Sequence, residues 1–237
     1  MNLPYWRTYL EESRSFYYSL FLILPLMVVY EIGTLWLFAN RPYELRNAAD
    51  ALLRFILDQV GLQPGYYFSF IFIGILILVL VLGMWREHRE PLNSIVFPMM
   101  LIESIVWGIA LFAVLQFIAK LTMDATVAHE WLVQVNLALG AGLYEELVFR
   151  VILIAAIAFI FQRGFHWRHA AAGWAGLVGA AIIFAGFHLF TEVFQWGVFI
   201  QRFTGGVILG ALYLKRGYGI TAYSHIFYNL IILTAFS

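Results

Sequence analysis

The chain has 237 residues, of which 63% are hydrophobic and 12% are charged, and its mean hydropathy is +0.84. A soluble domain of this length lacks the interior volume to bury so much apolar surface, so we expect a multi-pass integral membrane protein. The formal net charge is zero, which gives no basis for a nucleic-acid partner, and the absence of cysteine excludes disulfides, thiolate metal sites and a cysteine nucleophile.

Seven stretches are long and apolar enough, or nearly so, to cross a bilayer core that takes about 20 residues per helix. We expect no cleaved signal peptide in the first 18 residues, and we find no repeat or linker that would divide the chain. We therefore expect an all-α membrane helix bundle forming one domain, 1–237, with an N-terminal region 1–95 and a core 96–236. The predicted spans are 16–38, 66–85, 96–119, 136–161, 171–190, 197–214 and 219–236.

Between the first two spans, residues 47–61 are too short and too charged to cross the membrane. Their apolar residues recur at helical spacing, which predicts an amphipathic helix lying on the membrane surface. These apolar residues are Ala51, Leu52, Phe55, Ile56 and Val60.

Lysine and arginine are unevenly divided between the two sides of this seven-span arrangement. The N-terminus and the second, fourth and sixth loops hold eight, Arg216 among them, and the first and third loops hold four, which include Arg46 and Arg54. Since cytoplasmic loops are enriched in these residues, we expect the N-terminus in the cytoplasm and the C-terminus outside.

The fourth span contains the motif EELVFR, residues 145–150. Glu146 and Arg150 are four residues apart, so they share a helix face and predict an internal ion pair. Glu145 points about 100° away and has no same-helix cation one turn before or after it. A spare carboxylate inside the bilayer suits a general base or a metal ligand. The alternative is that both glutamates pair with Arg150 and hold helices together.

Two later spans carry FAGFH and HIFYN. Phe184 and His188 share one face of the fifth span, and His225 and Asn229 share one face of the seventh. Each pair alone is compatible with hydrogen bonding between helices. Together with Glu145, however, they place a carboxylate, two imidazoles and an amide on three neighbouring spans.

In this order, EELVFR, FAGFH and HIFYN fit the patterns EExxxR, FxxxH and HxxxN. The sequence thereby resembles the CAAX-protease and bacteriocin-processing-enzyme family of intramembrane proteases over about residues 96–236. The resemblance implies an endopeptidase with its site inside the bilayer.

The family pattern implies a role for each motif residue. Glu145 is the implied catalytic base, and His188 positions the attacking water. His225 and Asn229 stabilise the oxyanion, while Glu146, Arg150 and Phe184 support the site. Ser224 faces away from the His225 side of its helix, which argues against a serine nucleophile.

A metal-dependent mechanism is the alternative chemistry for the same residues. Glu145, His188 and His225 are acceptable zinc ligands, and three ligands plus water is a catalytic zinc pattern. The arrangement differs from HExxH, where both histidines lie on one helix. We favour the mechanism without a cofactor and keep zinc as the alternative.

Other polar and small residues in the spans have no assigned partner. Glu31 and Glu103 are expected either to line the site cavity, to meet Arg202, or to be partnered carboxylates at the interface. Arg202 is expected to pair with Glu192 or to extend to the interface. Gly206 and Gly210 form a GxxxG, which predicts close helix packing.

Two further functions compete with the endopeptidase. Intramembrane acids and histidines also form proton or ion relays, and a catalytically silent scaffold or immunity protein is possible on the same fold. We expect a membrane-associated protein or peptide substrate, with a prenylated C-terminal motif, bacteriocin maturation or sorting-signal cleavage as the family's associations. The short loops favour a prokaryotic cytoplasmic membrane.

Overall fold

The computed structural model describes residues 5–39, 45–62, 67–86, 92–122, 130–188 and 194–235. These residues form helices and no strand, which confirms the predicted all-α class. The helices are α1 (Tyr5–Glu12), α2 (Phe16–Phe38), α3 (Ala48–Gln59), α4 (Phe68–Arg86), α5 (Val96–Thr122), α6 (Trp131–Gly140), η1 (Ala141–Leu153), α7 (Ile154–Phe165), α8 (His169–Phe187), α9 (Trp196–Arg216) and α10 (Tyr218–Ala235).

Every predicted span coincides with helix in the structure. Among the described residues, α2, α5, α8 and α9 contain segments that are long and apolar enough to cross a membrane, and α4 contains a shorter apolar segment. These four helices support an integral membrane protein. The expected total of seven spans stays a prediction.

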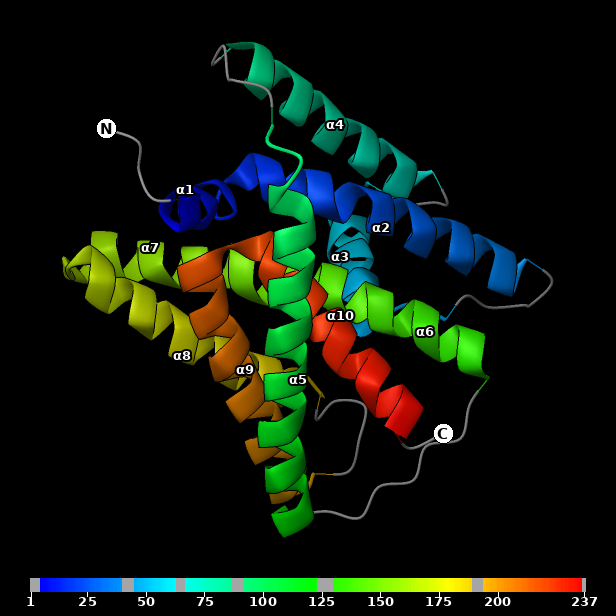
Figure 1. Cartoon of the computed structure of the whole chain (residues 1–237). Coiled ribbons are helices and arrows are strands. Elements are labelled where there is room, and N and C mark those ends of the chain that lie inside the picture. The colour runs from blue at the N-terminus through cyan, green and yellow to red at the C-terminus, as the bar shows by residue number, and fades with distance from the viewer. Residues whose placement is uncertain are drawn as a thin grey trace.

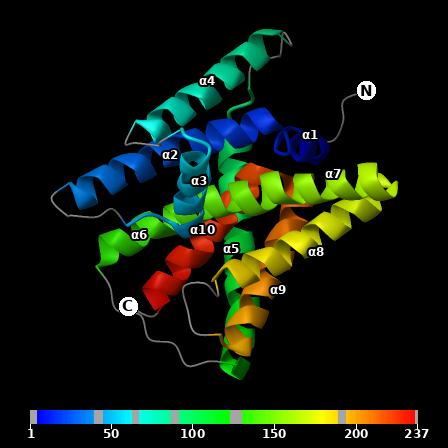
Figure 2. The same ribbon diagram turned by 180° about the vertical axis from the view of Figure 1, so that it is seen from behind.

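The helices are arranged around one long rod and one central helix. In Figure 1, α6, η1 and α7 continue one another as the rod, and α2 lies between this rod and α4. Figure 2 shows the same order from behind. Helix α10 is central, because it contacts α2, α5, α6, η1 and α9. Residues near the middle of the rod are thus covered from several sides.

Large apolar side chains point outward on the peripheral helices. Ile75 and Leu78 of α4 and Ile102 and Phe117 of α5 are each about half exposed or more. An apolar surface of this extent is unsuited to water and suits contact with lipid chains.

Helix α3 forms where the amphipathic helix is predicted, but its two faces have different roles. The inward face is polar, since Asp50 is fully buried, while Phe55, Ile56 and Val60 are exposed. Asn47 caps the helix by accepting a hydrogen bond from the Ala49 N–H at 2.9 Å. The apolar stripe faces away from the bundle, as a lipid-facing helix requires, and the polar stripe packs against the protein.

Glycine residues set two close approaches near the end of the chain. A Cβ on Gly206 or Gly210 would lie only 3.2 Å from Ala181 or 3.0 Å from Leu177, so the GxxxG of α9 packs against α8 as predicted. Gly217 has φ of +82° and alone joins α9 to α10. Only glycine adopts this left-handed backbone readily.

The two carboxylates without an assigned partner are both paired. Glu103 accepts two hydrogen bonds from the Arg216 guanidinium, each 2.7 Å long, and one of 2.5 Å from the Tyr9 hydroxyl. Glu31 accepts from Arg46 at 3.1 Å. Both residues are therefore partnered carboxylates, which is one of the expectations stated for them. The cations that pair with them are Arg216 and Arg46, not Arg202. Glu192, the partner suggested for Arg202, lies outside the described residues.

Candidate active site

Glu145 and Glu146 lie in the middle of the rod, on η1. Their side chains are buried, with Glu145 5% and Glu146 0% exposed. The sequence predicted ordinary α-helix here, whereas Ala141–Leu153 is wound as a π-helix. Departures of this kind from the α-helical ladder are concentrated at functional sites.

Glu146 contacts one group through each carboxylate oxygen, Oε2 through an ion pair and Oε1 through a hydrogen bond. Its Oε2 lies 3.1 Å from Arg150 Nε, which is the predicted ion pair one turn along the helix. Its Oε1 lies 2.7 Å from Nδ1 of His225 on α10. The Arg150 guanidinium also stacks 4.4 Å above the Phe184 ring of α8. Glu146 therefore joins η1 to α10, and its Arg150 partner joins η1 to α8.

Glu145 has a different environment. Its Oε1 accepts a hydrogen bond of 2.9 Å from the Asn47 amide, and His188 Nε2 lies 3.9 Å from the same oxygen. Its Oε2 makes no hydrogen bond within the described part of the chain. The alternative in which both glutamates pair with Arg150 is not observed among these residues, because only Glu146 contacts it.

The two histidines are oriented by acceptors on their Nδ1 atoms. His188 Nδ1 lies 2.9 Å from the Phe184 backbone carbonyl, which can only accept, so Nδ1 carries the proton. In its neutral form His188 then offers a lone pair on Nε2, toward Glu145. Oε1 of Glu146 is a carboxylate oxygen and likewise accepts from Nδ1 of His225, so this nitrogen carries the proton. His225 consequently donates from Nε2 only as the imidazolium.

Asn229 lies one turn beyond His225 on α10 and is partly buried. Its side chain forms no hydrogen bond with another residue in the described ranges. The structure thus brings Glu145, His188, Glu146 and His225 into one connected set, and leaves Asn229 as a neighbouring amide without a link to it.

Small residues allow the helices to approach the glutamates. A Cβ on Gly142 would overlap Ile226 and lie 2.5 Å from the Ala222 carbonyl oxygen, so α10 packs directly on the η1 backbone at this point. A Cβ on Gly140 would lie 2.8 Å from Cβ of Asn47. Gly142 thus lies where η1 packs against α10, and Gly140 lies against Asn47.

Sequence reasoning missed Asn47, although it directly contacts Glu145. Asn47 is held by its capping bond and by a hydrogen bond of 3.2 Å from its N–H to the Tyr30 hydroxyl. Tyr30 in turn donates to Asp50 at 3.0 Å. A signal was available, because polar residues at 47, 50 and 54 share one helix face of a segment that has an apolar stripe elsewhere.

The side chains around Asn47 form a buried ion-pair cluster between α2, α3 and η1. Arg46 binds Glu31 and Asp50 at 3.1 and 2.9 Å, and Arg54 binds Asp50 at 2.8 Å. Tyr144, the residue before Glu145, donates to Glu31 at 2.8 Å. We call Glu31, Arg46, Asp50 and Arg54 the α2–α3 ion cluster. It is linked to Asn47 through Tyr30, which donates to Asp50 and accepts from the Asn47 N–H.

A catalytic zinc ion takes three protein ligands at about 2 Å. Within the described residues no group of three His, Asp or Glu side chains is arranged to hold a metal. Glu145, His188 and His225 as they stand do not fit the three-ligand site, so we derive no step through a metal.

The matched family is the one that the three motifs indicated. Residues 127–231 match the family described as type II CAAX prenyl endopeptidase Rce1-like. This part of the chain is similar to that family. It contains EELVFR, FAGFH and HIFYN, so the predicted CAAX-protease relationship is confirmed, over a shorter range than the expected 96–236. Comparison with curated proteins and with solved structures gives no match.

The match to a CAAX endopeptidase family supports a protease embedded in the membrane. Asn47 and the α2–α3 ion cluster lie outside the matched residues. Asn47 nevertheless contacts Glu145 of the motif, and Glu31 accepts from Tyr144, the residue before it.

Proposed function

We propose that the protein is an intramembrane endopeptidase in which Glu145 activates the attacking water. The observation that carries the proposal is the contrast within the glutamate pair. Among the described residues, Glu146 has one partner at each oxygen, Arg150 and His225, whereas Oε2 of Glu145 makes no hydrogen bond and its Oε1 faces the Nε2 atom of His188. A buried carboxylate beside an imidazole lone pair is suited to remove a proton.

In the proposed reaction, a water molecule donates one hydrogen bond to Glu145 and the other to Nε2 of His188. Glu145 takes its proton as the oxygen attacks the scissile carbonyl. Glu145 then delivers that proton to the leaving amine, so no covalent intermediate forms. Nε2 of His188 lies 3.9 Å from Oε1 of Glu145, and we assign the water to Oε2 of the same carboxylate, beside this nitrogen.

The negative charge that develops on the carbonyl oxygen requires hydrogen-bond donors. We assign this role to Nε2–H of His225, in the imidazolium form that Glu146 stabilises, and to the amide of Asn229. Donors directed at a developing oxyanion in a low-dielectric site are worth a factor of about 100 to 1,000 each.

The remaining residues of the set position these groups. Arg150 pairs with Glu146 and rests on the ring of Phe184, whose backbone carbonyl orients His188. Asn47 is assigned as a positioning residue: its amide fixes Oε1 of Glu145, so that Oε2 is directed at the water.

The substrate is proposed to be a membrane-associated protein or peptide. The family's description names prenylated CAAX sequences, so a peptide of that class is the first to assay. The reaction is proposed to need no cofactor; zinc bound at one equivalent, and loss of cleavage on its removal, would contradict this.

The test maps new peptide termini in membranes of cells that produce the protein or the Glu145→Gln variant. Specific termini that vanish with Glu145→Gln establish a protease and identify its substrate. Glu11→Gln, the same change on the exposed surface of α1, is the matched control. Identical termini from the two well-folded proteins would instead favour the silent scaffold or the relay.

A further inference from the structure

A cavity whose lining residues do not include the two glutamates opens between α2, α4, η1 and the junction of α9 and α10. It has a volume of about 340 Å³ and is lined mainly by apolar side chains, such as Ile23, Met27, Phe72, Leu76 and Leu147. This volume is at the lower end of the range of ligand pockets, about 300 to 1,000 Å³.

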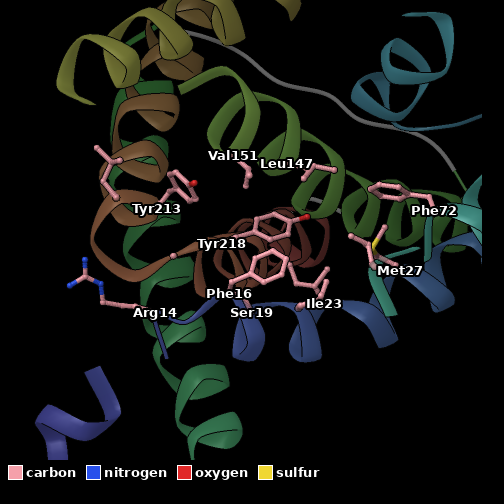
Figure 3. Close-up of a pocket in the computed structure, with 14 residues that line it drawn as sticks. Arg14, Phe16, Ser19, Ile23, Met27, Phe72, Leu147, Val151, Tyr213 and Tyr218 are labelled. Carbon is pink, nitrogen blue, oxygen red and sulfur yellow. The ribbon is translucent and has the colours of Figure 1, made fainter. Parts of the chain in front are cut away.

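The cavity is elongated along α2. Figure 3 shows Arg14 at one end of it and Met27 with Phe72 at the other. From Phe16 to Met27 the helix rises about 16 Å, which is close to half of a hydrocarbon core roughly 30 Å thick. The cavity therefore has the length of one lipid leaflet.

One end of the cavity lies at the ends of two membrane spans. Arg14 directly precedes the cap of α2, and Gly217 directly follows α9; a Cβ on Gly217 would be 3.2 Å from the Arg14 carbonyl oxygen. Tyr213 lines the same end (Figure 3), and aromatic hydroxyls are typical of the bilayer interface. This end thus combines a cation and a phenol at headgroup level.

The polar groups at this end are available to a ligand. Arg14 is exposed, and within the described residues neither its guanidinium nor the Tyr213 hydroxyl has a hydrogen-bond partner. By contrast, the Tyr218 hydroxyl is used, because it donates to the Leu143 carbonyl at 2.7 Å. Tyr218 is a wall of the cavity, and this bond fixes it to η1.

We propose that this cavity binds one acyl chain of an anionic glycerophospholipid, with the lipid phosphate at Arg14. The apolar lining accommodates the chain, but it gives no preference over the surrounding lipid, since both environments are equally apolar. Selectivity comes from the positive charge of Arg14, for which we expect about a fivefold preference for an anionic over a zwitterionic headgroup. The bound chain packs on Leu147 and Val151, and so supports η1 from the side opposite α8.

The test is native mass spectrometry of the whole protein with an equimolar mixture of phosphatidylglycerol and phosphatidylcholine carrying the same acyl chains. The wild-type protein is expected to retain one phosphatidylglycerol. Arg14→Gln is expected to lose the headgroup preference and keep a bound lipid. Arg7→Gln is the matched control, because Arg7 is exposed on α1 and does not line the cavity.

A cavity-filling change, Leu76→Trp on peripheral α4, is expected to remove bound lipid of both kinds. If this variant does not fold, the comparison of Arg14→Gln with Arg7→Gln still decides. Equal retention of the two lipids by the wild-type protein, or equal preference in the Arg14 and Arg7 variants, overturns the proposal. In those cases the cavity holds either unselected lipid or an uncharged chain.

Discussion

Two buried groups of charges lie next to each other in this protein, and their partners differ. In the α2–α3 ion cluster every carboxylate oxygen is occupied. Glu31 is bound by Arg46 and Tyr144, and Asp50 by Arg46 and Arg54. Glu145, a short distance away on η1, accepts only from an amide and keeps one oxygen without a hydrogen bond among the described residues.

On the proposed function, this difference separates carboxylates that hold helices together from the one that takes part in the reaction. A buried charge that is matched at every oxygen is stable where it is, and removing its partner leaves an unpaired ion. A buried carboxylate that is held at one oxygen and free at the other is oriented and still able to accept a proton. Asn47 connects the two groups, because it belongs to α3 and contacts Glu145.

The largest effect is expected from Glu145→Gln. Loss of the base should lower the cleavage rate by about 100- to 10,000-fold. The thermal unfolding temperature should stay close to that of the wild type, since no ion pair with an arginine or lysine is broken. The rate is measured as cleavage of a prenylated CAAX peptide or of a substrate found by terminus mapping. An unchanged rate would show that Glu145 is not the base and does not differ in role from the carboxylates of the ion cluster.

Glu31→Gln is the converse change in the ion cluster. Arg46 and Arg54 would be left buried without full compensation, which should lower the free energy of unfolding by about 3 to 5 kcal/mol. Equilibrium unfolding in mixed micelles measures this, with the exposed Glu11→Gln as control. A stable Glu31→Gln protein without cleavage activity would show that the cluster takes part in the reaction.

The link between the two groups can be broken with Asn47→Ser. Serine keeps the helix cap but loses the amide that reaches Glu145. We expect kcat to fall by about 10- to 100-fold with little change in KM, because misplacement of a catalytic group by about 1 Å has effects of this size.

The matched control for Asn47→Ser is Asn136→Ser. Asn136 is a buried amide of α6 that donates to Thr34 at 2.9 Å and does not contact Glu145. Equal losses of kcat in both variants would mean that Asn47 acts through general stability alone.

Gly142→Ala tests the approach of α10 to η1. The added methyl would overlap Ile226, so α10 must shift and the contact between His225 and Glu146 must lengthen. Overpacking of this kind typically costs about 1 to 3 kcal/mol, and we expect cleavage to fall with it. Gly173→Ala on α8, where a Cβ meets open space, should leave the unfolding temperature unchanged or slightly raised.

The smallest effect is expected from Tyr9→Phe, at the far end of the molecule. The lost hydrogen bond to Glu103 is worth about 1 kcal/mol. Burial, reinforced by Glu103, raises the pKa of Tyr9 above its usual value. Its contribution is therefore complete below pH 10 and decreases as the pH rises through the folded-state pKa. Unfolding curves from pH 8 to 11 should fall less steeply for Tyr9→Phe than for the wild type.

The sequence predicted the helical segments after α1 and the pairing of Glu146 with Arg150, because both depend on residues close together in the chain. The partners of Glu31, Glu103 and Glu145 were missed, because a helical pattern carries no information about which distant helices meet. Asn47 and Glu145 are separated by 98 positions, and Arg216 and Glu103 by 113.

The membrane orientation of the chain also stays a prediction. The count of loop charges on which it depends included Arg46, Arg54 and Arg216, yet in the structure all three take part in ion pairs within the bundle. Charges that are neutralised by folding are weak markers of the cytoplasmic side, and the remaining loop residues carry most of the evidence for it.

The order of the site residues along the chain also has a consequence for synthesis of the protein. Glu145 and His225 are separated by 80 positions, so at about 5 to 20 residues per second roughly 4 to 16 seconds pass between their synthesis. During that time the nascent chain has the proposed base without its partner on α10. On the proposed function, the site is therefore complete only after His225 has been made, and a chain that has not reached this residue does not cleave its neighbours.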